Sequence, residues 1–155
     1  MTSTDSITIR DCELSFGEEY DAIIDRLKNQ IQAYSDLDKD GNAFLTIGDI
    51  DVFEIKGEAS LFFHKGVLDN IVLTPEWNRY NLVKPNGDRL HIDEAVYLVY
   101  YKCHDCLVGK FGSKVNDEYI PEIYEISQHN IAVLCMSPGR DHVNLTIKRK
   151  EDRNE

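Results

Sequence analysis

Two cysteines separated by two residues have the spacing of a metal-binding or redox site. The tetrapeptide Cys103-His104-Asp105-Cys106 is half of a zinc-ribbon signature. A redox role would place such a pair at the N-terminus of a helix, where the thiolate is stabilised, whereas the surrounding pattern places it late in a helix. We therefore predict that Cys103 is a buried structural cysteine that carries no metal. A tetrahedral zinc site would need two further ligands, and the remaining candidates each stand alone in the sequence: Cys12, Cys135, His129 and His142.

Residues 38–49 carry oxygen ligands at the alternating positions that Ca²⁺ prefers, with Asp38, Asp40 and Asn42 at the first, third and fifth places. The segment resembles an EF-hand loop over about twelve residues. That family places Gly at the sixth position and a bidentate Glu at the twelfth, where this chain has Ala43 and Asp49. We favour a polar loop built from turn-forming residues and expect no metal or other cofactor. A calcium-binding module using the Asp38–Asp49 loop is the alternative.

Motifs of the common catalytic classes are missing from the sequence. It contains no GxSxG, no glycine-rich phosphate loop and no HExxH, and its five histidines are scattered. We therefore predict that the chain is not an enzyme and has no catalytic residues. A small-ligand or enzyme domain whose site is assembled from separated residues is a third alternative.

Charge is distributed unevenly along the 155 residues, whose net charge is −11. Residues 1–60 contain fourteen acidic and five basic residues, a net charge of −9. Such a field repels nucleic acids and anionic membranes and attracts basic surfaces. We therefore expect a basic protein partner, with no nucleic acid and no membrane as ligands. The candidate partner-binding residues are the acids of residues 36–58: Asp36, Asp38, Asp40, Asp49, Asp51, Glu54 and Glu58.

The first half of the chain predicts short strands, one helix and a β-meander. Residues 6–16 alternate loosely as one or two short strands. Apolar residues from Glu18 to Tyr34 recur at the spacing of one helical face. A polar loop at 36–42 precedes the meander, in which Lys65-Gly66 has the length and composition of a hairpin turn. The predicted strands are Phe44–Ile47, Ile50–Ile55, Ser60–His64 and Val67–Leu73.

The second half repeats this order, after a turn at 85–88. Asp93 is a suitable N-cap for a helix, whose apolar face consists of Val96, Val99, Tyr100, Cys103, Leu107 and Phe111. Three strands follow, with a turn at 137–141 between the last two, and residues 148–155 form a polar tail. The predicted strands are Ile123–Ile126, Ile131–Met136 and Val143–Ile147.

These elements predict an α+β fold of two helix-plus-β-meander halves. Each helix has one apolar stripe and each meander one apolar face, so we expect the helices to pack on a mainly antiparallel sheet. The length suits a single domain over residues 1–150 with a polar C-terminal tail at 151–155. We expect a cytoplasmic protein with reduced cysteines, because the N-terminus does not resemble a signal peptide and no apolar run is long enough to span a membrane.

The order of a strand, the helix beginning near Phe16-Gly-Glu-Glu-Tyr20 and the hairpin Leu61–Pro75 resembles small bacterial immunity proteins. These proteins neutralise polymorphic or contact-dependent toxins, and many carry an F-x-x-G-x-L-x-x-I hairpin; here it is matched by Phe63, Gly66, Leu68 and Ile71. The resemblance covers about half of the chain and implies a non-catalytic partner of a toxin domain. The charge agrees independently, because nucleases that grip phosphate backbones present basic clefts.

Overall fold

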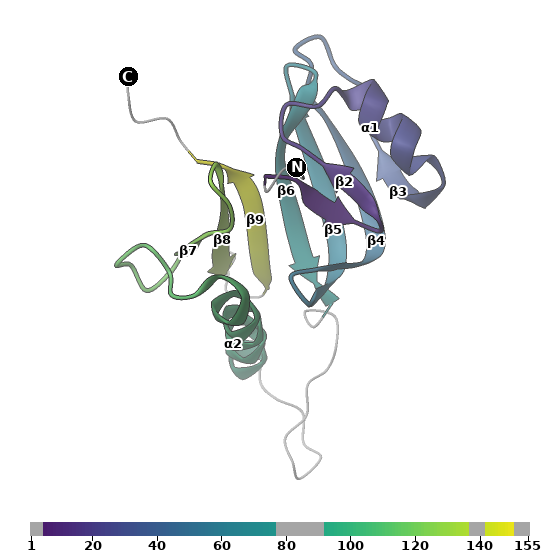
Figure 1. The fold of residues 1–155 in the computed structure, drawn as a ribbon. Coiled ribbons are helices and arrows are strands. Elements are labelled where there is room, and N and C mark those ends of the chain that lie inside the picture. The colour runs from purple at the N-terminus through teal and green to yellow at the C-terminus, as the bar shows by residue number, and fades with distance from the viewer. Residues whose placement is uncertain (1–4, 77–91, 137–141, 151–155) are drawn as a thin grey trace.

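The computed structural model describes residues 5–76, 92–136 and 142–150. Its two α-helices each follow and precede groups of consecutive strands, and Figure 1 shows their arrangement. The first part contains β1 (Ile7–Ile9), β2 (Cys12–Leu14), α1 (Tyr20–Leu27), a 3₁₀ turn (Lys28–Gln30), β3 (Ile31–Tyr34), β4 (Ala43–Val52), β5 (Ile55–His64) and β6 (Val67–Pro75). The second part contains α2 (Ile92–Phe111), β7 (Glu122–Glu125), β8 (Asn130–Met136) and β9 (Val143–Arg149).

One antiparallel sheet of seven strands organises the fold, in the order β3-β4-β5-β6-β9-β8-β7. The strands β3 to β6 form a meander, and β7 to β9 form a second one. The pairing of β6 with β9 over Asn70–Leu73 and Leu145–Lys148 joins the two meanders into a continuous sheet. The α+β class is therefore confirmed, while two equivalent halves are not shown, because the first part has an extra strand and the separate β1–β2 hairpin.

Residues that face each other across the strands show that one face of this sheet is covered. Leu45, Leu61, Ile71, Ile147, Ala132 and Tyr124 form one continuous row of cross-strand neighbours, and each is at most 1% exposed. The β1–β2 hairpin and α1 pack over the β4 side of this face, and α2 packs against β7, β8 and β9. The core is thus a single apolar layer between the sheet and these elements.

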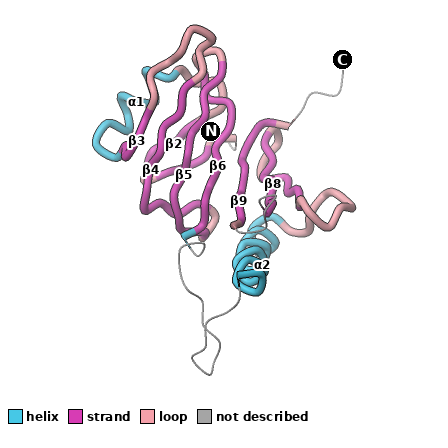
Figure 2. The backbone as a smooth tube through the Cα atoms, turned by 180° about the vertical axis from the view of Figure 1, so that it is seen from behind, coloured by secondary structure: helices cyan, strands magenta, loops and turns pink. Residues whose placement is uncertain are grey.

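The opposite face of the sheet carries no helix among the described residues. Figure 2, which views the fold from behind, shows β4, β5 and β6 without a helix across them. Its cross-strand rows are half-buried or exposed, and they mix apolar and polar side chains. One row is Thr46, Ser60, Val72, Thr146, Val133 and Ile123, and the next is Phe44, Phe62, Asn70, Lys148, Ile131 and Glu125.

The first helix ends earlier than its apolar periodicity indicates. Its α-helical part stops at Leu27, and Ile31–Tyr34 form the edge strand β3 instead of a fourth helical turn. Ile31 pairs with Ile47 and Tyr34 with Leu45, so the end of the segment gains hydrogen bonds to β4. The prediction of helix up to Tyr34 was wrong because tertiary pairing overrides local spacing in a segment this short.

The predicted strands of the first meander have different limits in the structure. Phe44–Ile47 and Ile50–Val52 belong to one strand, β4, which continues through a bulge at Gly48 and Asp49. The predicted strand Ile50–Ile55 is wrong beyond Val52, because Phe53 and Glu54 form the hairpin turn with φ of 57° and 68°. The hairpin turn at Lys65-Gly66 is confirmed, with positive φ at both residues.

The second helix and its strands follow the sequence pattern closely. Five residues of the predicted apolar face of α2 are buried, with Val96, Val99, Tyr100, Cys103 and Leu107 each at most 4% exposed, and the sixth, Phe111, is half-buried. The strand β9 extends to Arg149, so the polar tail begins later than residue 148. The turns predicted at 85–88 and 137–141 and the tail at 151–155 lie outside the described residues. Among the described helices, none has both the length and the apolar character needed to cross a bilayer.

We expect Cys103→Ser to lower the free energy of unfolding by about 1–3 kcal/mol, because the new hydroxyl would replace a fully buried thiol among apolar side chains. Urea unfolding measures this. The matched control is Cys106→Ser, whose thiol is half-buried and points to the carbonyl oxygen of Glu54 at 3.9 Å, where a hydroxyl can also donate. A loss as large for Cys106→Ser as for Cys103→Ser would contradict the burial argument.

Candidate functional site

The seven candidate partner-binding acids lie in two groups at opposite ends of β4. Asp36, Asp38 and Asp40 belong to the loop between β3 and β4, which we call the loop group. Asp49, Asp51, Glu54 and Glu58 belong to the bulge and hairpin at the other end, which we call the hairpin group. In Figure 1 the loop lies at the top of the sheet and the hairpin at the bottom. The sequence places these acids within 23 positions of each other, but most of the strand β4 (Ala43–Val52) lies between the two groups.

The loop group is held in place by its own backbone. The carboxylate oxygen Oδ1 of Asp38 accepts hydrogen bonds from the backbone N–H of Asp40 at 2.8 Å and of Asn42 at 2.9 Å. The bond from Asn42, followed by that from Asp40, holds the pKa of Asp38 below its usual range. Asp38 is thus a turn-forming residue whose charge is stabilised, while Asp36 and Asp40 are exposed.

The loop also rests on the β5–β6 turn. The N–H of Gly66 donates to the carbonyl of Gly41 at 2.9 Å, and the side chain of Asn42 bonds to His64 Nδ1 at 2.8 Å. A Cβ added to Gly41 would lie 2.6 Å from the backbone nitrogen of Gly66, and the φ of Gly41 is +78°. Only glycine fits this position, so the loop presents its acids from a fixed base.

The calcium interpretation of residues 38–49 does not match this geometry. Asp38, Asp40 and Asn42 lie in a loop between two strands, whereas Asp49 lies in the bulge far along β4. The segment after Asp49 continues as a strand. Over the residues that the structure covers, no group of three or more His, Cys, Asp or Glu side chains is placed to hold a metal ion.

The hairpin group is shaped by the bulge in β4. Gly48 and Asp49 together face Glu58, and Asp49 has a φ of 51°. The guanidinium of Arg10 donates from Nη2 to the carbonyl of Gly48 at 2.7 Å and to that of Asp49 at 3.4 Å. The bulge therefore has a cationic support from β1–β2 on its backbone, while the Asp49 carboxylate is exposed.

The tip of the β4–β5 hairpin contacts α2 and brings in acids from the second half of the chain. The rings of Phe53 and Phe111 meet edge to face with centroids 4.9 Å apart. The thiol of Cys106 is half-buried and points to the carbonyl of Glu54, and its pKa is raised by burial and then by the carboxylates of Glu54, Asp105 and Asp51. Asp105 therefore joins the hairpin group in space, although its distance along the sequence gave no indication of this.

The two cysteines of the CxxC motif have different surroundings. Cys103 is fully buried on the sheet side of α2, as predicted, and burial raises the pKa of its thiol to about 12. Cys106 faces the hairpin tip instead. The thiol of Cys103 is thus protonated and unreactive at neutral pH.

A buried polar network on the other side of α2 was not indicated by the sequence. The carboxylate of Glu122, on β7, lies on the covered face and is 6% exposed. It accepts hydrogen bonds from the hydroxyl of Tyr124 and from Nδ1 of His104 at 2.7 Å. Burial, followed by the charge of Glu122, raises the pKa of Tyr100 nearby. This network satisfies a carboxylate that would be costly to bury alone and fixes the orientation of α2 over β7.

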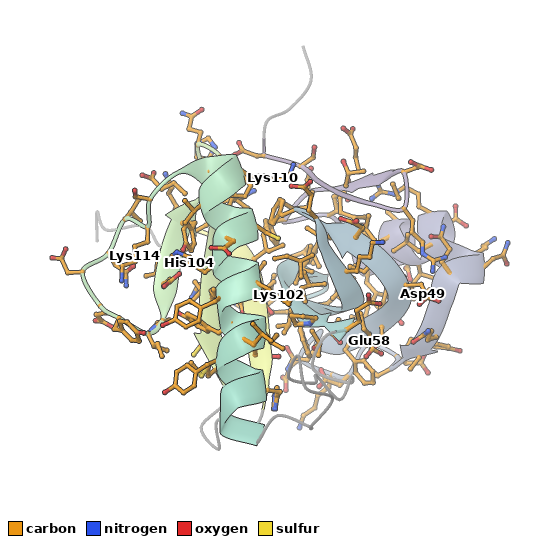
Figure 3. All side chains as sticks on the ribbon, turned by 90° about the horizontal axis from the view of Figure 1, so that it is seen from below. Asp49, Glu58, Lys102, His104, Lys110 and Lys114 are labelled. Carbon is orange, nitrogen blue, oxygen red and sulfur yellow. The ribbon has the colours of Figure 1, made fainter. Side chains whose placement is uncertain are left out.

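The side chains labelled in Figure 3 show how these groups are separated. Asp49 and Glu58 lie on one side of α2, and His104 and Lys114 lie on the other. The carboxylates of the hairpin group and the buried network of Glu122 therefore lie on different sides of α2.

A second carboxylate–imidazole contact connects the N-terminal segment to the β7–β8 turn. Asp5 accepts hydrogen bonds from the side chains of His129 at 2.7 Å and Ser127 at 2.6 Å, and from the backbone N–H of His129. The bond from the His129 ring, followed by those from Ser127 and the His129 backbone, lowers the pKa of Asp5 to about 2. The segment preceding β1 is thereby fixed to the turn between β7 and β8, in the second meander.

Neither protein-family models nor curated proteins nor solved structures give a match to this chain.

We expect Asp5→Asn to lower the melting temperature at neutral pH, because the folded state holds this pKa near 2 against the usual 3.8. A lowered carboxyl pKa stabilises the fold above the unfolded value, and this contribution disappears as the pH falls from about 3.8 to about 2. Thermal unfolding of both proteins over this range should show the difference shrinking. Asp25→Asn is the control, because its exposed pair with Lys28 contributes little; a difference independent of pH would contradict the charge argument.

We expect calcium not to bind. Its titration should give no measurable heat and should leave the melting temperature unchanged. The Asp38 carboxylate is already bonded to its own loop, and Asp49 lies near the far end of β4, the strand that follows the loop. Isothermal calorimetry with calcium and magnesium tests this. A dissociation constant in the micromolar range, abolished by Asp40→Asn, would instead establish the calcium-binding alternative.

Proposed function

We propose that this chain is an acidic, non-catalytic binding protein that neutralises a basic toxin or nuclease domain, in the manner of immunity proteins. The observation that carries the proposal is the state of its surface carboxylates. Six of the seven candidate acids are exposed: Asp36, Asp38, Asp40, Asp49, Asp51 and Glu54. None of these six takes part in an ion pair with another described residue. Acids without an intramolecular cation are those most available to a basic partner.

The spacing of the two groups suits one macromolecular partner. The strand β4 has ten residues, which corresponds to roughly 30 Å at about 3.3 Å per residue. A standard protein interface covers about 800 Å² on each partner, a patch roughly 30 Å across. One partner that lies along the β4 side of the molecule would therefore contact both the loop group and the hairpin group.

Local rigidity also supports a binding role. The loop group is fixed by Asp38 and by the contact of Gly41 with Gly66, and the hairpin group is fixed by Arg10 and by the packing of Phe53 on Phe111. A rigid acidic surface loses little conformational entropy when a partner docks. Attraction between unlike charges then accelerates the encounter.

The test uses the toxin or nuclease domain encoded next to the gene of this chain. Its activity should be inhibited by the purified chain at equimolar concentration, and co-expression should restore growth. A neighbouring gene product that is neither bound nor inhibited would refute the proposal.

We expect the variant Asp36→Lys/Asp40→Lys/Asp51→Lys/Glu54→Lys to associate at least about tenfold more slowly at low salt, because it reverses four exposed charges that steer encounter. The difference should largely vanish at about 0.5 M salt, where the charges are screened. Stopped-flow association kinetics at both salt concentrations measure this.

The matched control is Glu118→Lys/Asp117→Lys, which reverses exposed acids between α2 and β7 and should leave association nearly unchanged. Circular dichroism should show that both variants keep the fold, because exposed substitutions usually cost within about 0.5 kcal/mol each. Binding that ignores the four acids but depends on Asp117 and Glu118 would show that the partner docks elsewhere.

A further inference from the structure

The uncovered face of the sheet contains a groove of about 590 Å³ over β7, β8 and β9. Its floor consists of Ile123, Ile131 and Val133, which are half-buried and belong to the two cross-strand rows of that face. Contiguous apolar side chains left open on a surface are characteristic of binding sites. The volume is within the usual range for small-molecule pockets, about 300–1,000 Å³.

The wall of the groove is built by residues 113–121, which fold back along the outer edge of β7. The N–H of Val115 donates to the carbonyl of Ile123 at 2.8 Å. The side chain of Asn116 donates to the carbonyl of Pro121 at 2.8 Å and accepts from the N–H of Ile123 at 2.9 Å. These bonds fix residues 113–121 along the edge of β7, beside the apolar floor. The groove is therefore a fixed feature of the fold.

The charged residues that line the groove have a net positive charge, whereas the chain as a whole is negative. Lys148 and Lys150 face it together with Glu125, and Lys150 is paired with Glu125. Lys148 is half-buried, lies between Asn70 and Ile131 in its row, and has no carboxylate partner within the described residues. One uncompensated cation thus adjoins an apolar floor in a chain whose net charge is −11.

We propose that this groove binds a small amphiphilic carboxylate, in which an aliphatic chain or a ring carries one negative charge. The apolar body lies over Ile123, Ile131 and Val133, and the carboxylate pairs with Lys148. Burial of the apolar body supplies most of the affinity, and the ammonium group selects for the anion. The site is separate from the acidic groups on β4 and therefore does not depend on the proposed function. Lys148 would repel a basic partner from this groove.

The probe is sodium decanoate, compared with decylammonium, which has the same chain and the opposite charge. We expect decanoate to shift the backbone amide resonances of Ile123, Ile131 and Val133 with a dissociation constant below ~1 mM. Decylammonium should leave these three amides unshifted, even where it binds the acidic surface elsewhere. Equal shifts of these amides by both probes would overturn the proposal, as would the absence of any shift with decanoate at ~1 mM.

Two variants test the assigned groups. Lys148→Met removes the charge but keeps an unbranched side chain, and should weaken decanoate binding about fivefold to tenfold. Val133→Glu places a carboxylate on the floor and should abolish it. The control Lys39→Met removes an exposed lysine from the β3–β4 loop and should have no effect. Unchanged affinity for Lys148→Met, or an equal loss for Lys39→Met, would refute the assigned ion pair.

A second copy of the chain is the competing occupant of this face. Sedimentation equilibrium should give a monomer whose mass is unchanged by decanoate. A dimer that dissociates on Val133→Glu and excludes decanoate would show that the groove is a subunit interface and would overturn the proposal.

Discussion

The antiparallel pairing of β6 with β9 connects two meanders that would otherwise each have an open edge. Four residues on each strand take part, Asn70–Leu73 and Leu145–Lys148. Their register places Ile71 beside Ile147 and Leu73 beside Leu145, so the apolar sides of both meanders point to the same face. A slip of one residue would turn one meander over and separate the core beneath α1 from the core beneath α2. Every later feature of the molecule depends on this shared face.

A sheet covered on one side only has two different surfaces, and this chain uses them differently. The covered face holds an almost entirely apolar core with one ionisable exception, Glu122, whose carboxylate is hydrogen-bonded to His104 and Tyr124. The uncovered face is apolar at β7 and β8, small and polar in the middle, and aromatic at Phe44 and Phe62. Burial of a carboxylate requires such partners, and their geometry in turn fixes where α2 lies.

The candidate acids of residues 36–58 are concentrated near the two ends of β4. The bulge at Gly48 and Asp49 and the turn at Phe53 and Glu54 put carboxylates on tightly curved backbone, where side chains project outward. The contact of Phe53 with Phe111 holds the hairpin tip on α2, where the carboxylates of Glu54, Asp105 and Asp51 all raise the pKa of the Cys106 thiol. Lys148, which has no carboxylate partner within the described residues, lies apart from these acids, on β9 in the groove of the uncovered face.

Local patterns in the sequence determined the elements whose signal is strong over their whole length. The apolar face of α2, the glycine turn at Lys65-Gly66, the strands β7 to β9 and the burial of Cys103 all follow from spacing and turn chemistry, as does the excess of acids before residue 60. The tertiary structure alone decided the change from helix to strand at Ile31, the bulge that removes Asp49 from the Asp38 loop, the joining of the meanders through β6 and β9, and the meeting of Glu122 with His104. Each of these depends on hydrogen bonds or packing between residues distant in the chain. The free energy of such contacts exceeds the small local preferences that a sequence pattern reports, so the pattern alone could not indicate them.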